Sequence, residues 1–162
     1  MKINRKIYFN ILIIFLILLL DQTSKFYIIY YLNQNDIEIY LTSFLNLQLI
    51  WNNGIAFGLL SFDNNFYYNL ITFVIVIVIM ILLFYIKKLD TSSYFYSMIV
   101  GGATGNLIDR IRYSSVPDFI DFHLYNFHWF VFNIADIFVS LGVFCLIIAE
   151  IFFNKNMTNE KN

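Results

Sequence analysis

Charge, cysteine and clusters of basic residues are all scarce in this chain of 162 residues. Only 13% of the residues are charged, whereas soluble domains carry about 25%. The net charge of -1 and the lack of a clustered basic stretch argue against attraction to nucleic acid, so we expect no nucleic-acid partner. Cys145 is the single cysteine, which excludes an internal disulfide and metal sites made of several cysteines. Because no HExxH or similar zinc spacing occurs, we expect neither a metal nor another cofactor.

Long apolar runs dominate the sequence instead. Hydrophobic residues make up 60% of the chain, and they gather in four runs, residues 7–32, 66–86, 94–111 and 134–153. Roughly 20 helical residues at about 1.5 Å each cross a hydrocarbon core of about 30 Å, so each run can span a membrane. The third run, which is rich in glycine, is the weakest. We therefore predict an all-α membrane protein with four transmembrane helices and one membrane-embedded domain over residues 1–162.

The placement of lysine and arginine predicts the orientation of these spans. Seven of the ten lysines and arginines lie in three stretches, residues 2–6, 87–88 and 155–161, and none occurs between Phe26 and Ile86. The exceptions are Lys25, Arg110 and Arg112, of which the first two stand close to aspartates and suggest engaged charges. The positive-inside rule then places both termini in the cytoplasm and the two long connections outside. The first run resembles a cleavable signal peptide, but the polar residues 21–25 stand where a small-residue cleavage site would be, so we expect an uncleaved span.

The two outer connections have strand-like patterns. Apolar and polar residues alternate over residues 36–41 and 45–51, as in half-buried strands. The stretch from residue 119 to 132 is rich in aromatic residues, and Tyr125 with Asn126 suggests a turn. Because aromatic residues favour the membrane interface, we predict a small β-sheet with aromatic-rich loops on the outer membrane face.

Two aspartates, Asp118 and Asp136, lie at the outer ends of apolar segments. An ionisable group at membrane depth is costly, which makes it a candidate functional residue. Two carboxylates brought together can share one proton and activate water, as in aspartyl proteases. A simpler interpretation of Asp136 is a capping box with Asn133 at the start of a helix. Asp121 lies on the same loop as Asp118 and is the residue most easily mistaken for it as the first carboxylate.

Other polar residues lie close to the same ends of the predicted spans. Asp21 and Lys25 are spaced to pair on one helix face, either as a structural ion pair or with a direct role in catalysis. The neighbours Asp109 and Arg110 suggest a second engaged pair, in a polar network with Asn106. Gly101 and Gly105 have the spacing of close helix packing. The segment from Asn52 to Gly58 indicates a turn, or a loop that holds an extended substrate.

Taken together, four blocks resemble lipoprotein signal peptidase, the bacterial signal peptidase II. The blocks are Asp21-Gln22-x-x-Lys25, Asn52-x-Gly54-x-Ala56-Phe57, Gly105-Asn106-x-x-Asp109-Arg110 and Val116-x-Asp118…Asn133-x-Ala135-Asp136. They occur in the family's order and spacing, and the resemblance covers residues 7–153. Pro117 departs from the family, which more often has a β-branched residue there; proline stiffens the approach to Asp118 without removing chemistry.

The resemblance implies a membrane aspartic endopeptidase of the bacterial inner membrane, which cuts prolipoproteins just before a diacylglyceryl-modified cysteine. Asp118 and Asp136 would be the catalytic pair. The supporting polar residues would be Asn52, Gly54, Asn106, Arg110 and Asn133, with Asp21 and Lys25 behind them. The helix dipole favours ionised Asp136 as the base and Asp118 as the acid, although such a pair titrates as a unit. The expected partners are lipid-modified prolipoproteins and membrane lipid, and we expect a monomer.

Three other classes of protein share some of these features. A small transporter or channel subunit also carries intramembrane charges, but here the charges cluster at the outer ends of the spans. Presenilin-type and prepilin-type proteases carry a Gly-x-Gly-Asp block, which this chain lacks. A non-catalytic membrane scaffold would not require the polar spacings.

The predicted orientation can be tested by labelling with a thiol reagent that does not cross membranes. In a Cys145→Ser background, a cysteine at Asp36 should be labelled from outside and a cysteine at Lys88 only from the cytoplasmic side, because the positive-inside rule places the two connections on opposite faces. Labelling of both cysteines from the same side would overturn the orientation.

Overall fold

The computed structural model describes residues 5–32, 38–54, 65–88, 90–125 and 127–159. It contains four helices, α1 (Arg5–Leu32), α2 (Asn65–Ile86), α3 (Ser93–Tyr113) and α4 (Ile134–Asn159). Their positions confirm the four runs as helices. Among the described residues, α1, α2 and α4 contain segments long and apolar enough to cross a membrane, and α3 does not meet that measure.

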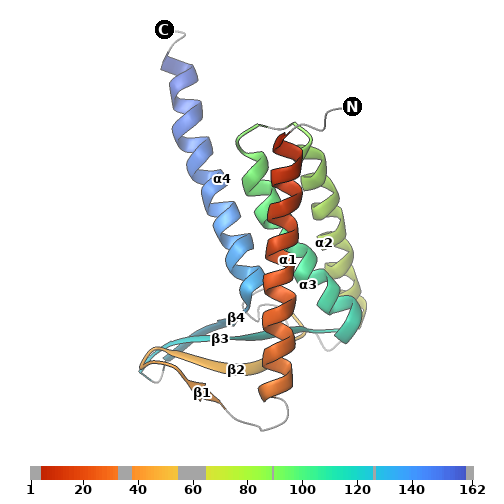
Figure 1. Cartoon of the computed structure of the whole chain (residues 1–162), viewed down its shortest axis with the longest axis vertical. Coiled ribbons are helices and arrows are strands. Elements are labelled where there is room, and N and C mark those ends of the chain that lie inside the picture. Colours follow the sequence, from red (N-terminus) through yellow and green to blue (C-terminus); the bar gives the residue numbers. More distant parts are fainter. Residues whose placement is uncertain (1–4, 33–37, 55–64, 89, 126, 160–162) are drawn as a thin grey trace.

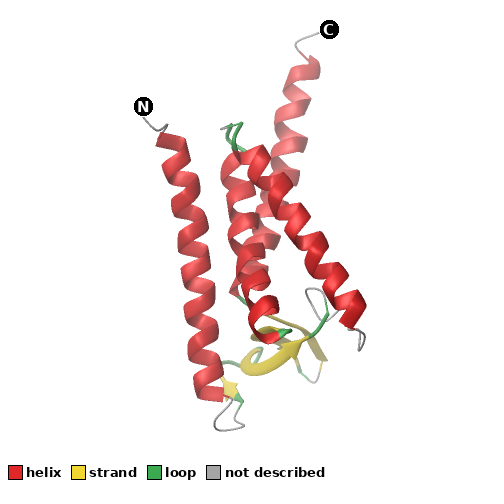
Figure 2. Ribbon diagram, turned by 90° about the vertical axis from the view of Figure 1, so that its right-hand side faces the viewer, coloured by secondary structure: helices red, strands yellow, loops and turns green. Residues whose placement is uncertain are grey.

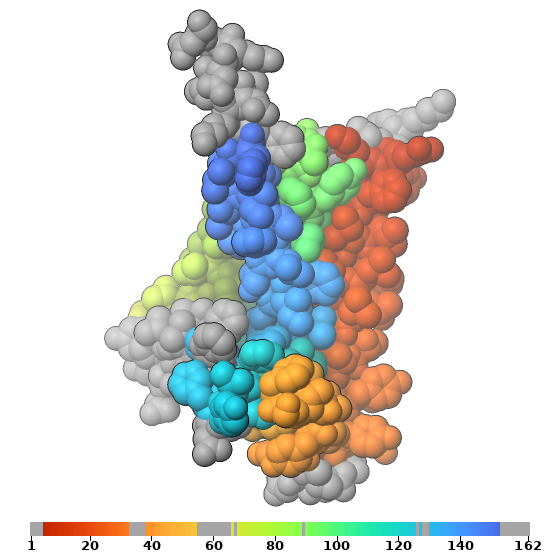
Figure 3. Space-filling model, turned by 90° about the vertical axis from the view of Figure 1, so that its left-hand side faces the viewer, coloured from red at the N-terminus to blue at the C-terminus, as the bar shows by residue number. Residues whose placement is uncertain are grey.

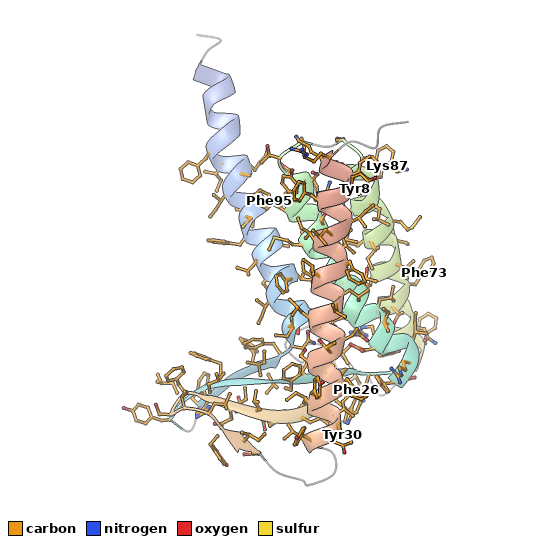
Figure 4. All side chains as sticks on the ribbon, viewed as in Figure 1. Tyr8, Phe26, Tyr30, Phe73, Lys87 and Phe95 are labelled. Carbon is orange, nitrogen blue, oxygen red and sulfur yellow. The ribbon has the colours of Figure 1, made fainter. Side chains whose placement is uncertain are left out.

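The helices turn large apolar side chains outward. Figure 4 shows Tyr8, Phe26 and Phe73 as sticks that project away from the ribbon of their helices. About three-fifths of the surface of each of these side chains is exposed, 60%, 65% and 62% respectively. A soluble helix would turn such side chains toward a core, so this surface is suited to contact with lipid.

A four-stranded antiparallel sheet lies at one end of the helices. Its strands are β1 (Ile39–Tyr40), β2 (Leu45–Asn52), β3 (Val116–Leu124) and β4 (Phe127–Phe132), and they lie side by side in that order. Figure 1 shows the sheet at the end opposite the start of α1 and the end of α4. In Figure 2, turned by 90°, the sheet again lies across the ends of the helices.

The strands confirm the alternating patterns found in the two long connections. β2 covers the predicted stretch 45–51, and β1 covers part of 36–41, of which residues 36 and 37 lie outside the described residues. The aromatic-rich stretch forms most of β3 and β4. Tyr125, between these two strands, has a φ of 53°, the left-handed conformation that a tight turn often requires.

The sheet has one apolar and one polar face. Residues paired across strands point to the same face, and Phe122 pairs with both Leu45 and Phe130. Asp118 shares that face, because alternate residues of a strand point the same way. Asp118 contacts Asn133 just before α4, so the apolar face is turned toward the helices. In Figure 3, β2 and β3 lie beneath α4 and beside α1.

The opposite face of the sheet is polar. Asn46 pairs in register with Asp121 across β2 and β3, and both side chains are buried there. Asp118 and Asp121 are three positions apart on one strand and therefore point to opposite faces. The two carboxylates of β3 are thus separated by the sheet itself.

Helix α3 lies against each of the other three helices. Its glycines permit the close approach: a Cβ on Gly102 would collide with the carbonyl oxygen of Ala135 in α4, and one on Gly105 would collide with Asp21 in α1. This confirms close packing at the glycine-rich segment. Because α3 is enclosed by its neighbours, it needs less apolar surface, which explains why the third run is the weakest.

Gly102→Ala should destabilise the protein, although alanine favours an isolated helix over glycine by about 1 kcal/mol. The added methyl group meets backbone of α4, which cannot rotate away, and overpacking of this kind costs about 1–3 kcal/mol. Thermal unfolding in detergent micelles measures the effect. Thr104→Ala on the same helix is the control and should change stability by less than about 1 kcal/mol. An unchanged or higher melting temperature for Gly102→Ala would contradict the described contact of α3 with α4.

Candidate active site

The structure brings Asp118 and Asp136 together where the sheet meets the helices. Asp118 is the third residue of β3, and Asp136 lies in the first turn of α4. Both are almost completely buried, with 2% and 5% of their surface exposed. Burial of an ionised carboxylate is costly unless hydrogen bonds or opposite charges replace water, so the surrounding donors decide what this pair can do.

Asn133 links the two aspartates. The backbone N–H of Asp136 donates to Asn133 Oδ1 at 3.0 Å, and the backbone N–H of Asn133 donates to Asp136 Oδ2 at 3.3 Å. This reciprocal pair is the predicted capping box. The Asn133 side chain also donates from Nδ2 to Asp118 Oδ1 at 2.6 Å. Asn133 therefore both caps α4 and contacts the second carboxylate, Asp118. From the sequence, a capping role and a role in the aspartate pair were alternative interpretations of this segment.

Two further asparagines complete the set of donors. Asn52, the last residue of β2, donates from Nδ2 to Asp118 Oδ2 at 2.8 Å. Asn106 of α3 donates from Nδ2 to Asp136 Oδ1 at 2.8 Å. With the two contacts from Asn133, each of the four carboxylate oxygens accepts one N–H group. The predicted supporting asparagines thus all contact the pair.

Burial, and after it the neighbouring Asp136 carboxylate, raise the pKa of Asp118 to about 7. Hydrogen bonds from Asn52 and Asn133 and the charge of Lys25 oppose this rise without cancelling it. Asp118 therefore holds a proton up to near-neutral pH, where an ordinary aspartate has lost it. Two adjacent carboxylates that hold one proton between them are the arrangement that activates water in aspartyl proteases.

A buried cation lies behind Asn106. Lys25 Nζ contacts Asp21 Oδ2 at 2.8 Å and Asp109 Oδ2 at 2.6 Å, and it donates to Asn106 Oδ1 at 2.9 Å. The predicted pair of Asp21 and Lys25 is confirmed. The expected engagement of Asp109 with Arg110 is wrong, because successive helix residues point in different directions. Asp109 faces α1, where it meets Lys25.

Arg110 faces α2 and the end of β2 instead. Its guanidinium lies over the ring of Tyr68, 5.1 Å from the centroid, and its Nη2 donates to the carbonyl oxygen of Gly54. Gly54 in turn donates its N–H to Asn52 Oδ1 at 2.8 Å, in agreement with the predicted turn. Nε and Nη1 of Arg110 are buried and have no partner among the described residues. Residues 55–58 of the same motif, including Ala56 and Phe57, lie outside the described residues.

Gln22 was not assigned a role from the sequence, yet its side chain joins the same network. Its Nε2 donates to Asp21 Oδ2 at 3.1 Å, to Asp109 Oδ1 at 3.2 Å and to the carbonyl oxygen of Gly105 at 3.3 Å. The available signal was a glutamine next to Asp21 in an apolar helix. Asp121 lies on the far face of the sheet, with His123 Nδ1 at 3.8 Å from its Oδ2.

Comparisons with known proteins agree on one family. The model of the family described as "Signal peptidase (SPase) II" matches residues 13–152. A lipoprotein signal peptidase from Pelagibacter ubique (strain HTCC1062) is 53% identical over 164 residues, which cover 99% of each chain. One from Thermodesulfovibrio yellowstonii is 41% identical over 139 residues, 85% of this chain and 91% of that relative.

Two solved structures share the fold of this chain. A bacterial membrane enzyme solved by the in meso method at 2.3 Å resolution has a TM-score of 0.77 and 31% identity, and the match covers 94% of this chain and 92% of that one. A second bacterial membrane enzyme, solved in the same way at 1.9 Å resolution, has a TM-score of 0.66 and 29% identity, over 88% of this chain and 92% of that one.

Proposed function

Because this chain belongs to the signal peptidase II family, and so removes signal peptides from prolipoproteins, we propose that it is an aspartic endopeptidase whose catalytic pair is Asp118 and Asp136. One observation carries this proposal: two buried carboxylates are joined through Asn133, and each of their oxygens accepts one N–H group. This arrangement keeps both groups fixed and lets them hold a single proton at near-neutral pH.

In the proposed reaction, Asp136 acts as the base and Asp118 as the acid. Asp136 takes a proton from water as the water oxygen attacks the carbonyl carbon of the scissile peptide bond. Asp118 gives its proton to the carbonyl oxygen, which yields a neutral tetrahedral intermediate. When the C–N bond breaks, the amine nitrogen takes up the proton held by Asp136, and the hydroxyl proton returns to Asp118. The products are a carboxylic acid and an amine, and the pair again holds one proton.

Arg110 is proposed to hold the substrate backbone. Its Nε and Nη1 groups are buried without a partner among the described residues, and unsatisfied buried donors are costly. A carbonyl oxygen of an extended peptide would satisfy them. Asn52 and Gly54 support this role, because their turn fixes the guanidinium through the Gly54 carbonyl. Asp21 and Lys25 are proposed to support the pair indirectly, through Ala135 and Asn106.

The apolar face of the sheet supports a lipid-modified substrate. Ile50, Phe122 and Phe130 leave 43%, 40% and 42% of their surface exposed. Ile50 pairs directly with Asp118 across β2 and β3, so this apolar surface leads to the catalytic pair. Acyl chains of a diacylglyceryl group could cover it, which would place the bond just before the lipid-modified cysteine close to Asp118.

We propose that all four helices cross the bacterial inner membrane as one domain, residues 1–162, with both termini in the cytoplasm and the active site at the outer face. The 28 residues of α1 correspond to about 42 Å of helix, which is more than a hydrocarbon core requires. Helix α3 lies against each of the other three helices, which supports a fourth crossing despite its lower hydropathy. The protein is proposed to act as a monomer with lipid around it.

Replacing either aspartate should abolish cleavage. Asp118→Asn and Asp136→Asn each keep the shape of the side chain but remove the shared proton or its acceptor, so turnover should fall by at least about 10³-fold. Because the pair acts as one unit, the double variant should be scarcely worse than either single variant. The measurement is release of the signal peptide from a lipid-modified prolipoprotein by purified enzyme in micelles, with thermal unfolding as the check on folding.

Asp121→Asn is the matched control for these variants. Asp121 lies on the same strand and is equally buried, but it points to the opposite face of the sheet. Substantial activity should therefore remain. An inactive but folded Asp121→Asn together with an active Asp118→Asn would show that the wrong carboxylate has been assigned.

The rate of cleavage should fall as the pH rises through about 7, because the proposed acid, Asp118, has its pKa raised to about 7. The sign follows from the raised value: the catalytic proton is present below that pH and is lost above it. Well above the midpoint, kcat/KM should fall about tenfold for each pH unit. The pH profile of kcat/KM measures this, with folding checked at each pH. A rate that keeps rising to pH 9 would contradict protonated Asp118 as the acid.

A further inference from the structure

Three asparagines lie beside the aspartate pair. In each of them, a hydrogen-bond donor that contacts the amide oxygen fixes the orientation of the amide group. Asn52 Oδ1 accepts the backbone N–H of Gly54 at 2.8 Å, and Asn133 Oδ1 accepts the backbone N–H of Asp136 at 3.0 Å. A backbone N–H can only donate, so these contacts settle which amide atom is the oxygen. The nitrogen of each amide therefore faces Asp118.

The third amide, that of Asn106, is oriented by a side chain. Its Oδ1 accepts from Lys25 Nζ at 2.9 Å, while its Nδ2 donates to Asp136 Oδ1 at 2.8 Å. An ammonium group has three donors and no acceptor, so Lys25 requires the amide oxygen on its own side. Asn133 Nδ2 also donates to Asn106 Oδ1, but at 3.2 Å, and the same nitrogen lies 2.6 Å from Asp118.

We propose that Lys25 is a positioning residue for the catalytic pair, which holds the Asn106 amide with its nitrogen toward Asp136. The inference rests on the proposed role of Asp118 and Asp136. The three donors of the Lys25 ammonium are matched by three acceptors, on Asp21, Asp109 and Asn106. The position of the ammonium group is therefore fixed. Because Asn106 Oδ1 accepts one of its hydrogen bonds, the orientation of the Asn106 amide is fixed as well.

The orientation of Asn106 decides where the shared proton lies. An N–H group that faces Asp136 Oδ1 needs an oxygen that is free to accept. If the amide turned around, its carbonyl oxygen would face the carboxyl group, and the contact would require a proton on Asp136. Lys25 therefore favours the state in which Asp118 carries the proton and Asp136 is ready to take one from water.

A test must separate this role from a merely structural one. Lys25→Met alone leaves Asp21 and Asp109 buried without their cation, which is expected to unfold the protein. The double variant Lys25→Met/Asp109→Asn removes one charge of each sign. Asp21 then keeps its contacts with Gln22 and with the backbone N–H of Ala135 at 3.0 Å. The charged groups left around the pair are Asp21 on α1 and Arg110 on α3.

The experiment compares four enzymes: the wild type, Lys25→Met/Asp109→Asn, Asn106→Ala and the triple variant that combines them. Cleavage of a lipid-modified prolipoprotein in micelles gives kcat, KM and the pH profile for each. The double variant should lose about 10- to 100-fold in kcat, the size of one hydrogen bond to a charged group, with KM nearly unchanged. Its pH optimum should move upward by on the order of one unit, because the N–H group that favours ionised Asp136 is no longer held toward it.

Asn106→Ala should show the same changes, and the triple variant should be no worse than Asn106→Ala, because Lys25 acts through Asn106. A double variant with the kcat and pH profile of the wild type would overturn the proposal. So would losses that multiply in the triple variant. Either result would leave the aspartate pair in place, whereas cleavage by Asp118→Asn or Asp136→Asn would refute the pair itself.

Asn10→Ala is the matched control for loss of stability. Asn10 is also a buried residue on α1 that contacts α3, through Ser93 Oγ at 3.1 Å. It lies fifteen positions before Lys25, about 22 Å along the helix. This variant should lower the melting temperature and leave both kcat and the pH profile unchanged. A shifted pH profile for Asn10→Ala would show that the shift reports loosened helices and would remove the support for positioning.

Discussion

A carboxylate that leaves water must be given hydrogen-bond donors, and the junction of sheet and helices is organised by that requirement. The donors to the pair come from three separate places: the end of β2, the middle of α3 and the residue before α4. These elements must therefore meet at one point before the charges can be buried. Gly102 and Gly105 contribute by letting α3 come close enough to α4 and α1. The packing of the helices and the environment of the aspartate pair thus depend on the same close contact of α3 with α1 and α4.

Much of this fold could be predicted from the sequence because its pattern is strong. Long apolar runs define the helices to within a few residues, and alternation defines β2 and parts of the other strands. The weak third run was also informative, since a helix enclosed by protein needs less apolar surface than one that faces lipid. The order of the sheet was beyond prediction, because β2 and β3 pair although α2 and α3 lie between them in the chain.

The site was predictable as a set of residues and less so as a set of contacts. Aspartates and asparagines in apolar surroundings are costly to bury, which marks them as candidate site residues. The spacing of four blocks then pointed to the family. Which groups pair is decided by the crossing of helices, which no local pattern records. Asp109 therefore meets Lys25 of α1 and not its neighbour Arg110. Gln22 bridges two carboxylates, although its place beside Asp21 did not indicate the second of them. The amide orientations follow only from the complete network.

The separation of the two aspartates along the chain has a consequence for biosynthesis. Asp118 lies on β3, but Asp136 and its cap lie at the start of α4, the last helix to be made. A partly synthesised chain that ends before α4 has one carboxylate and lacks the amide that joins it to the other. On the proposed assignment of Asp118 and Asp136, proteolytic capacity therefore arises only after α4 has been made and packed against α3.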